Sequence, residues 1–316
     1  MEILKYIVSG AVLGITEGLP VSSSGHALLM GHIFGQDETF RTIFSVLHIG
    51  VLIAIIATYY KVIFGLIKSF FSVIKNIFTG KFSFRNLDRS ENMLVTLGIG
   101  LIPLLLLFVP VLGSGTNVLG VAHEFSDADN MVLCGISFLI NGILLKLGID
   151  SLKSEKFNYT YKTADNVVKR WDGRMRLTAM DAIWCGVMQF VSMIFPGISH
   201  IGAVLSIGLI RGINRQVMLT YSFLLGFSSI AIVLFSEIWF STNFIEVLKP
   251  NINALLLGSL CSLVFGFLFI KIIGSMVKKN KTFVFFVYSM VLGIIISAVG
   301  IFEQIRGINI FSGMIL

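Results

Sequence analysis

The sequence predicts an all-α, polytopic membrane protein built as two inverted repeats, each with a re-entrant helix hairpin and three transmembrane helices. Three observations predict this fold. The composition is strongly apolar, basic intervals alternate with apolar runs, and two short segments each combine Pro, Gly and Ser.

The composition indicates that a bilayer is the solvent of this chain. Of its 316 residues, 55% are hydrophobic and only 13% are charged, and the mean hydropathy is +0.90. A soluble domain carries roughly 25% charged residues. The N-terminal stretch lacks a basic n-region and a small-residue cleavage site, so we expect no removable signal peptide. Cys134, Cys185 and Cys261 lie in apolar runs without metal-type spacing, which favours packing roles.

The placement of charge predicts the topology. Most of the 24 Lys and Arg residues lie in three intervals, 61–89, 146–176 and 271–281. The segments 113–129 and 241–250 hold one Lys and several acidic residues. Lys and Arg concentrate in cytoplasmic loops, so the three intervals are expected inside and the two segments outside. This alternation argues against a nucleic-acid partner as the explanation of the net charge of +7.

Six apolar runs are long enough to cross the hydrocarbon core as helices. These runs are 42–60, 94–112, 130–149, 219–240, 251–273 and 282–302. With the loops assigned as above, the first three helices run in the opposite sense to the last three, which predicts an inverted repeat. The expected parts are a first repeat at 1–149, a cytoplasmic basic linker at 150–178, and a second repeat at 179–316.

A less regular stretch precedes each set of three helices. The first contains GITEGLPVSSSGHALLMGH and the second FPGISHIGAVLSIGLIRG, and in both a Pro is followed three residues later by a Ser. Backbone broken by Pro and Gly survives at membrane depth only where it is buried in protein or lines a wet cavity. We therefore expect re-entrant hairpins at about 10–33 and 186–212. Sites with half-helix N-termini aimed at anionic groups occur at such junctions.

Glu17, the run Ser22–Ser24 and His26 are the candidate chemical groups of the first segment. An ionisable group at membrane depth is a functional candidate. Glu17 can act as base or metal ligand, a Ser as donor or nucleophile, and His26 as proton carrier. The structural alternatives are a carboxylate at the water interface and serines that cap or pack helices. For His32 and His48 we favour a role in bridging transmembrane helices.

These segments resemble a known family. TEGLPVSSSGH resembles the signature of the undecaprenyl-diphosphate phosphatase family, the bacitracin-resistance membrane phosphatases of bacteria, and PGISHIGA resembles its PG-x-SRSGA segment. LHIGVLIAI at 47–55, GIGLIP at 98–103 and YSFLLG at 221–226 also have family-like counterparts. The resemblance implies a multi-pass hydrolase of the bacterial plasma membrane. It would convert undecaprenyl diphosphate to undecaprenyl phosphate at the outer face, recycling the carrier for cell-wall and peptidoglycan synthesis.

The resemblance also implies roles for single residues. Glu17 matches the second acidic residue of the family's Glu-x-x-x-Glu pair, and His26 matches the motif His. The implied catalytic residues are Glu17, Ser23 and His26, with Glu17 also a ligand of a divalent cation, magnesium or calcium. The implied substrate-binding residues are Ser22, Ser24, Gly197, Ser199 and His200. Whether Ser23 is a nucleophile or only a donor stays open, as does a homodimer.

Two positions depart from the family pattern. Leu13 stands where the family has the first acidic residue, one helical turn before Glu17. His200 replaces the Arg, and it can donate only singly to phosphate where Arg grips with a charged fork. These departures predict reduced activity unless another group compensates, such as Gln189 or one of Arg41, Arg211 and Arg215. They also keep an alternative open, a lipid-phosphate transporter or a non-hydrolysing lipid-binding protein on the same scaffold.

Overall fold

The structure is a computed structural model that describes residues 2–34, 38–113, 115–126, 130–151, 158–162, 168–240 and 244–311. Five segments of this described chain are long and apolar enough to cross a membrane. They are Thr42–Phe78, Arg89–Phe108, Met131–Ser151, Phe244–Lys278 and Phe283–Arg306. The sixth predicted span, 219–240, lies within a helix of 26 residues, Arg215–Phe240. The chain is therefore a multi-pass membrane protein.

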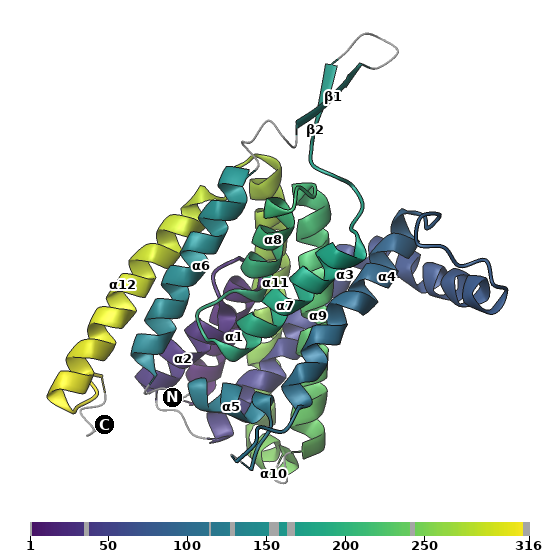
Figure 1. Cartoon of the computed structure of the whole chain (residues 1–316). Helices are drawn as coiled ribbons and strands as arrows, with labels where there is room; N and C mark the ends of the chain where they lie inside the picture. Colours follow the sequence, from purple (N-terminus) through teal and green to yellow (C-terminus); the bar gives the residue numbers. More distant parts are fainter. Residues whose placement is uncertain are drawn as a thin grey trace.

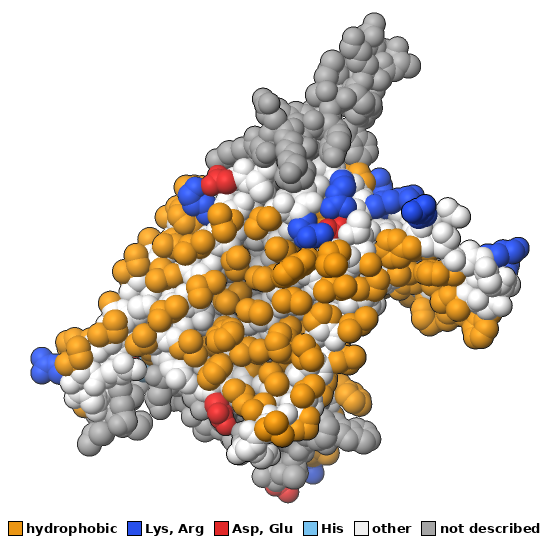
Figure 2. Space-filling model, viewed as in Figure 1, with side chains coloured by type: hydrophobic (Ala, Val, Ile, Leu, Met, Phe, Trp, Pro, Cys, Tyr) orange, Lys and Arg blue, Asp and Glu red, His pale blue; other side chains and the backbone are white. Residues whose placement is uncertain are grey.

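The helices form one bundle with a projecting arm and a thin hairpin (Figure 1). Hydrophobic side chains cover the flank of the bundle, while most visible Lys and Arg side chains gather toward its upper end (Figure 2). In chain order the α-helices are α1 (Glu2–Glu17), α2 (Ser23–Phe34), α3 (Glu38–Phe78), α4 (Arg89–Leu101), α5 (Val118–Phe125), α6 (Met131–Ser151), α7 (Ala179–Ile194), α8 (His200–Ile210), α9 (Arg215–Phe240), α10 (Phe244–Leu248), α11 (Ile252–Lys278) and α12 (Phe283–Arg306).

Small residues bring α1 and α3 into backbone contact with α11. A Cβ added at Gly10 would lie 2.0 Å from the carbonyl oxygen of Gly258, and one at Gly50 would lie 2.1 Å from that of Ser259. Only Gly permits such close approach, which is how transmembrane helices gain packing without a hydrophobic driving force. The end of α1, and with it Glu17, is thereby fixed against α3 and α11.

A second close-packed pair is formed by α6 and α12, which run side by side in Figure 1. Gly135 of α6 and Gly293 of α12 face each other, because a Cβ at either would lie 2.8 Å from the other's carbonyl oxygen. Helix α6 also packs along α8. It therefore connects α12 to the centre of the bundle.

Two helical segments are each broken into a pair of shorter helices at the places where the sequence has Pro, Gly and Ser. The chain breaks between α1 and α2 at residues 18–22, and between α7 and α8 at 195–199. Pro20 and Pro196 lie inside these breaks, where the missing N–H of Pro is tolerated. Ser199 caps α8, with its side chain accepting from the N–H of Gly202. Both predicted interruptions are thus present as broken helices.

Two predicted spans have different bounds from those expected. Helix α3 does not end near residue 60 but continues to Phe78, past a kink at Tyr59 with φ −106° and ψ 17°. The spaced Lys residues beyond Tyr60 are exposed on a helix and do not form a loop. The span predicted at 94–112 is observed at Arg89–Phe108, so it both begins and ends before the predicted residues. Helix α4 ends at Leu101, and a 3-10 helix covers Ile102–Phe108, where Pro103 cannot continue the α-helical hydrogen bonding.

The all-α prediction misses a two-stranded antiparallel hairpin in the interval 150–178. Strand β1 (Asn158–Lys162) pairs with β2 (Val168–Asp172). Both strands contain the aromatic and β-branched residues that favour strands, which the high density of charge in this interval concealed. The chain after β2 is tied to the bundle, because Arg174 pairs with buried Asp181 through two contacts of 3.0 and 3.3 Å.

Candidate active site

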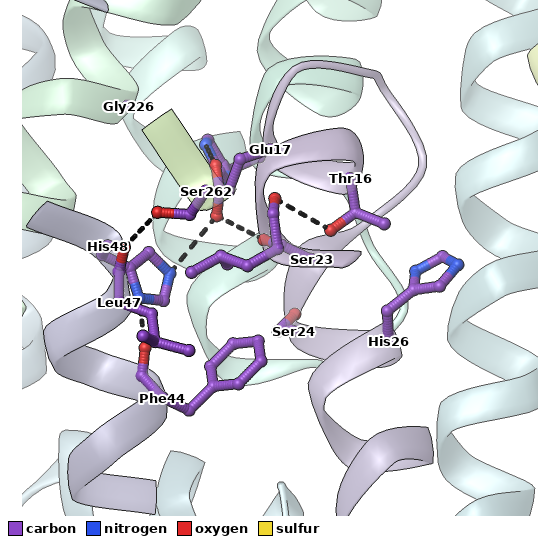
Figure 3. Close-up of polar contacts among 12 residues, drawn as sticks. Thr16, Glu17, Ser23, Ser24, His26, Phe44, Leu47, His48, Gly226 and Ser262 are labelled. Atoms are coloured by element: carbon purple, nitrogen blue, oxygen red, sulfur yellow. Dashed lines mark hydrogen bonds and ion pairs between the residues drawn. The ribbon is translucent and has the colours of Figure 1, made fainter. Parts of the chain in front are cut away.

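Glu17 is the centre of a buried polar cluster. It is the last residue of α1 and is only 3% exposed. The Ser23 hydroxyl at the start of α2 donates a short hydrogen bond to Glu17 Oε1. His48 Nε2 lies 3.5 Å from Oε1, and His200 Nε2 lies 3.2 Å from Oε2. Figure 3 shows Ser23 and His48 facing the Glu17 carboxylate. A buried carboxylate thus meets one hydroxyl and two imidazoles.

The four members of this cluster come from four helices. Glu17 ends α1, Ser23 begins α2, His48 lies within α3, and His200 is the first residue of α8. His48 Nδ1 donates to the carbonyl oxygen of Phe44, at 3.1 Å. A neutral imidazole carries one proton. His48 therefore offers Glu17 a second proton only when the ring is positively charged.

Gly226 of α9 makes room for His200. A Cβ at this position would lie 2.9 Å from Cδ2 and 3.0 Å from Nε2 of the His200 ring. These distances are shorter than ordinary van der Waals contact. The absence of a side chain at 226 therefore leaves the space that the His200 ring occupies beside Glu17.

Hydrogen bonds join the two helix breaks to each other. Ser22 Oγ accepts from the backbone N–H of Gly197 at 3.1 Å and from that of Gly25 at 3.2 Å. Ser22 has φ +65° and Gly197 has φ +110°. A non-Gly residue at positive φ costs on the order of 1–3 kcal/mol and tends to occur at functional sites. The strained turn of one break is therefore stabilised by the backbone of the other.

Asn141, which lies in α6, hydrogen-bonds to both of these breaks. Its Nδ2 donates to the carbonyl oxygen of Pro20 at 3.2 Å and to Ser289 Oγ at 3.0 Å. Its Oδ1 accepts from the N–H of Ser199 at 3.0 Å. One buried amide thus contacts both breaks and also α12.

His26 does not join the Glu17 cluster. Figure 3 shows its ring projecting away from Glu17 and Ser23. His26 Nδ1 donates to the carbonyl oxygen of Ser22, at 2.7 Å, so the neutral ring accepts at Nε2 from the Tyr288 hydroxyl, also at 2.7 Å. The ring also packs edge-on against Phe138. Both ring nitrogens are therefore occupied by groups other than Glu17.

The remaining predicted residues lie at defined places around the breaks. Ser24 shares a hydrogen bond of 3.2 Å with Ser22 and is half-buried. Leu13 is fully buried in the apolar core. Gln189 is buried and donates to Ser229 Oγ of α9, at 2.6 Å. Its other amide atom, Oε1, makes no hydrogen bond within the part of the chain that the structure describes.

Two of the three Arg residues offered as replacements for the family Arg contact other groups than Glu17. Arg211 follows α8 at the end opposite to His200 and pairs with Asp181. Eleven helical residues separate the two ends by about 16 Å. Arg215 donates to the carbonyl oxygen of Val277. The side chain of Arg41 lies outside the described residues. Within the described chain, Glu17 forms ion pairs with His48 and His200 and with no Lys or Arg.

Sequence reasoning missed His48, Asn141, Gly226 and Tyr288. His48 was interpreted as a helix-bridging residue, although it lies in the stretch LHIGVLIAI. Gly226 likewise belongs to a family-like stretch, as the last residue of YSFLLG. A polar or Gly residue inside such a stretch is the signal that could have marked both. Asn141 and Tyr288 lie in apolar helices, and nothing near them in the sequence indicates that Asn141 reaches both breaks or that Tyr288 reaches His26.

The cluster has partial capacity for a cation. Glu17 Oε2 and His200 Nε2 approach each other but are not aligned for a hydrogen bond, so each can take a further ligand. Among the described residues, no three His, Cys, Asp or Glu side chains are arranged to hold a metal ion. A cation here would depend on Glu17 and on ligands supplied by a substrate. Mg²⁺ binds in this way, through one or two carboxylates and substrate phosphates.

The fold and cluster define a multi-pass membrane protein whose broken helices meet around a buried carboxylate. Residues 6–295 match the family model of the bacitracin resistance protein BacA. The chain therefore belongs to the BacA family.

Named relatives cover the same length. The chain is 30% identical over 297 residues to an undecaprenyl-diphosphatase of Korarchaeum cryptofilum, covering 94% of this chain and 98% of that protein. It is 31% identical over 298 residues to an undecaprenyl-diphosphatase of Methanosphaera stadtmanae, covering 93% and 97%. A third, from Alkaliphilus metalliredigens, is 31% identical over 302 residues, covering 94% and 98%.

Proposed function

We propose that this protein is an undecaprenyl-diphosphatase. It hydrolyses undecaprenyl diphosphate to undecaprenyl phosphate at the outer face of a bacterial plasma membrane and so recycles the lipid carrier for cell-wall synthesis. The single observation that carries the proposal is the buried Glu17 carboxylate, in contact with Ser23 and His200 where two broken helices meet. The name shared by its relatives gives the substrate.

The proposed reaction needs one oriented nucleophile. A water oxygen attacks the terminal phosphorus, the bond from that phosphorus to the bridging oxygen breaks, and the water proton passes to Glu17. Phosphoryl transfer relies on positioning and charge stabilisation more than on covalent chemistry. Ser23 already donates to Glu17, so the same carboxylate is placed to accept the Ser23 proton if the hydroxyl attacks in place of water.

The diphosphate would be bound by the two helices that begin at the breaks. Ser23 begins α2 and His200 begins α8, and helix N-termini attract anions through their free N–H groups and dipole. His200 and His48 add positive charge when protonated. Ser24 and the backbone near Gly197 are proposed as further contacts. A divalent cation held by Glu17 and the phosphate oxygens would offset the negative charge of the substrate.

We propose His26 as a positioning residue and not as the proton carrier. Its ring is held between the Ser22 carbonyl and the Tyr288 hydroxyl. It would fix the strained turn at Ser22 that carries the adjacent hydroxyls.

The inverted repeat and the outward orientation of the site belong to the same proposal. Lys61 follows His48 by thirteen positions along α3, a rise of about 20 Å. Lys61 opens the first basic interval, which the positive-inside rule assigns to the cytoplasm. His48 therefore lies nearer the other face, from which a re-entrant α1–α2 pair would present Glu17.

The experiment is phosphate release by purified protein in detergent. Given undecaprenyl or farnesyl diphosphate with Mg²⁺ or Ca²⁺, the wild type should liberate phosphate. Glu17→Gln keeps the shape but removes the charge, and we expect a loss on the order of 10²–10³-fold or more. Glu246→Gln, which removes an exposed carboxylate in α10, is the matched control and should keep the wild-type rate.

The same assay separates the proposal from the lipid-phosphate carrier. Leu13 is buried and apolar, and no Arg pairs with Glu17 within the described chain, which suits a protein that binds without hydrolysis. Saturable binding of farnesyl diphosphate with no phosphate release above the Glu17→Gln background would favour the carrier and refute the enzyme.

A further inference from the structure

Helix α3 has a second part that leaves the bundle. Beyond the kink at Tyr59, residues 61–78 continue as a regular helix, which we call the arm. In Figure 1 the end of α3 projects to one side of the bundle, next to α4. The segment Thr42–Phe78 has 37 residues and would measure about 55 Å if straight. The hydrocarbon core is about 30 Å thick, so an arm that continued along the membrane normal would carry its exposed apolar side chains into water.

The arm presents three different faces. One face packs on the protein: Ser69 and Val73 are buried, and the Ser72 hydroxyl donates to Glu91 Oε1 of α4, at 2.6 Å. The opposite face is apolar and exposed. Phe64, Phe71 and Phe78 are 59%, 66% and 87% exposed. Ile67, Phe70 and Ile77 are exposed beside them.

Between these faces runs a row of positive charge. Lys61, Lys68 and Lys75 are exposed and follow one another at intervals of seven residues. Seven residues make nearly two turns, so the three ammonium groups lie along one line of the helix. Lys68 Nζ lies 4.7 Å from the centre of the Phe64 ring. The Lys68 ammonium thus lies at the border of the aromatic face, in cation–π contact with one of its rings.

The surroundings of the arm carry the same sign of charge. Lys81, Arg85 and Arg89 follow it, and the one acidic residue between 61 and 90, Asp88, caps α4. In Figure 2 the arm at the right has orange side chains along its lower surface and blue side chains above and at its tip. This separation of apolar and basic faces is typical of helices that lie in the plane of a membrane interface.

We propose that the arm lies flat on the cytoplasmic leaflet and binds anionic phospholipids. The Phe and Ile face enters the acyl region, and the row Lys61, Lys68 and Lys75 binds phosphodiester headgroups that carry net negative charge. Each Lys near an anionic surface favours binding by about fivefold, so the row of three supports a preference on the order of 10²-fold. The proposal does not depend on the hydrolytic reaction.

The test places one fluorescent probe on the apolar face. Phe71→Trp is made in the full chain after the native Trp171, Trp184 and Trp239 are replaced by Phe. The protein is reconstituted in vesicles of phosphatidylcholine with one-third phosphatidylglycerol. Bromine atoms on the acyl chains should quench the introduced indole, whereas aqueous acrylamide should not. Quenching by acrylamide with none by brominated lipid would overturn the proposal, and protection from both would assign the face to a second copy of the chain and overturn it as well.

Headgroup choice is measured with the same probe. Brominated phosphatidylglycerol should quench the indole several-fold more than brominated phosphatidylcholine at equal content. Replacing Lys61, Lys68 and Lys75 together by Gln should abolish that difference. Replacing Lys278, Lys279 and Lys281 by Gln removes the same amount of charge at the end of α11. This control should leave the difference in quenching between the two lipids unchanged. Equal quenching by both lipids in the parent protein would refute the selection of anionic headgroups.

Discussion

Replacing Gly226 by Ala tests whether the approach of His200 to Glu17 supports the proposed reaction. The added Cβ would lie 2.9 Å from His200 Cδ2, and ordinary contact begins at 3.4 Å, so the ring and α9 must shift relative to each other by about 0.5 Å or more. The ring now lies 3.2 Å from Glu17 Oε2. A misplacement of about 1 Å costs on the order of 10²-fold in rate, so we expect phosphate release to fall about 10- to 100-fold. That loss corresponds to about 1.4–2.7 kcal/mol.

The assay is steady-state phosphate release, with kcat and KM measured separately. Gly274→Ala in α11 is the matched control, because a Cβ there meets nothing within 4 Å. It should leave the rate unchanged. In a His200→Ala background, Gly226→Ala should have no further effect, because the two changes act through the same contact. Additive losses in the double variant, or a wild-type rate for Gly226→Ala alone, would refute this reasoning.

Three other substitutions give distinct expected outcomes. Ser23→Ala should lower kcat by about 10-fold or less if the hydroxyl only orients water, and a loss above roughly 10⁴-fold with intact binding would identify Ser23 as the nucleophile. Asn141→Leu leaves three buried polar groups without a partner, each costing about 1–3 kcal/mol, so it should lower both Tm in detergent and activity. Tyr288→Phe should keep kcat within about threefold, because His26 faces away from Glu17, and a loss of about 100-fold would return His26 to the proton path.

The membrane helices could be predicted because apolar length and charge placement are local properties of the sequence. The breaks at Pro20 and Pro196 could be predicted for the same reason. The arm could not, because Lys residues seven apart in an apolar run were interpreted as a loop between spans. The pairing of β1 with β2 was missed because the charges of this interval outweighed its strand-forming residues. The opposite orientation of the two halves stays a prediction.

The site could be predicted only where its residues lie in the two broken segments. Glu17 and Ser23 are close in sequence, so the short connection between α1 and α2 is enough to bring them into contact. His48 and Gly226 reach the same place from α3 and α9, and only packing between distant helices brings them there. The place of His26 could not be predicted, because a backbone carbonyl and a Tyr from α12 hold its ring away from Glu17, and its catalytic role stays a prediction.

The single amide of Asn141 has a consequence for how the protein responds to its bilayer. It contacts Pro20 in one break and Ser199 in the other, so the covalent length of one side chain sets the separation between them. A thicker or thinner bilayer is accommodated by changes in helix tilt, at a cost of a fraction of a kcal/mol per ångström. Such tilting can move the outer ends of the helices while the distance between the two breaks stays constant. Turnover should therefore vary little with the acyl-chain length of the host lipid.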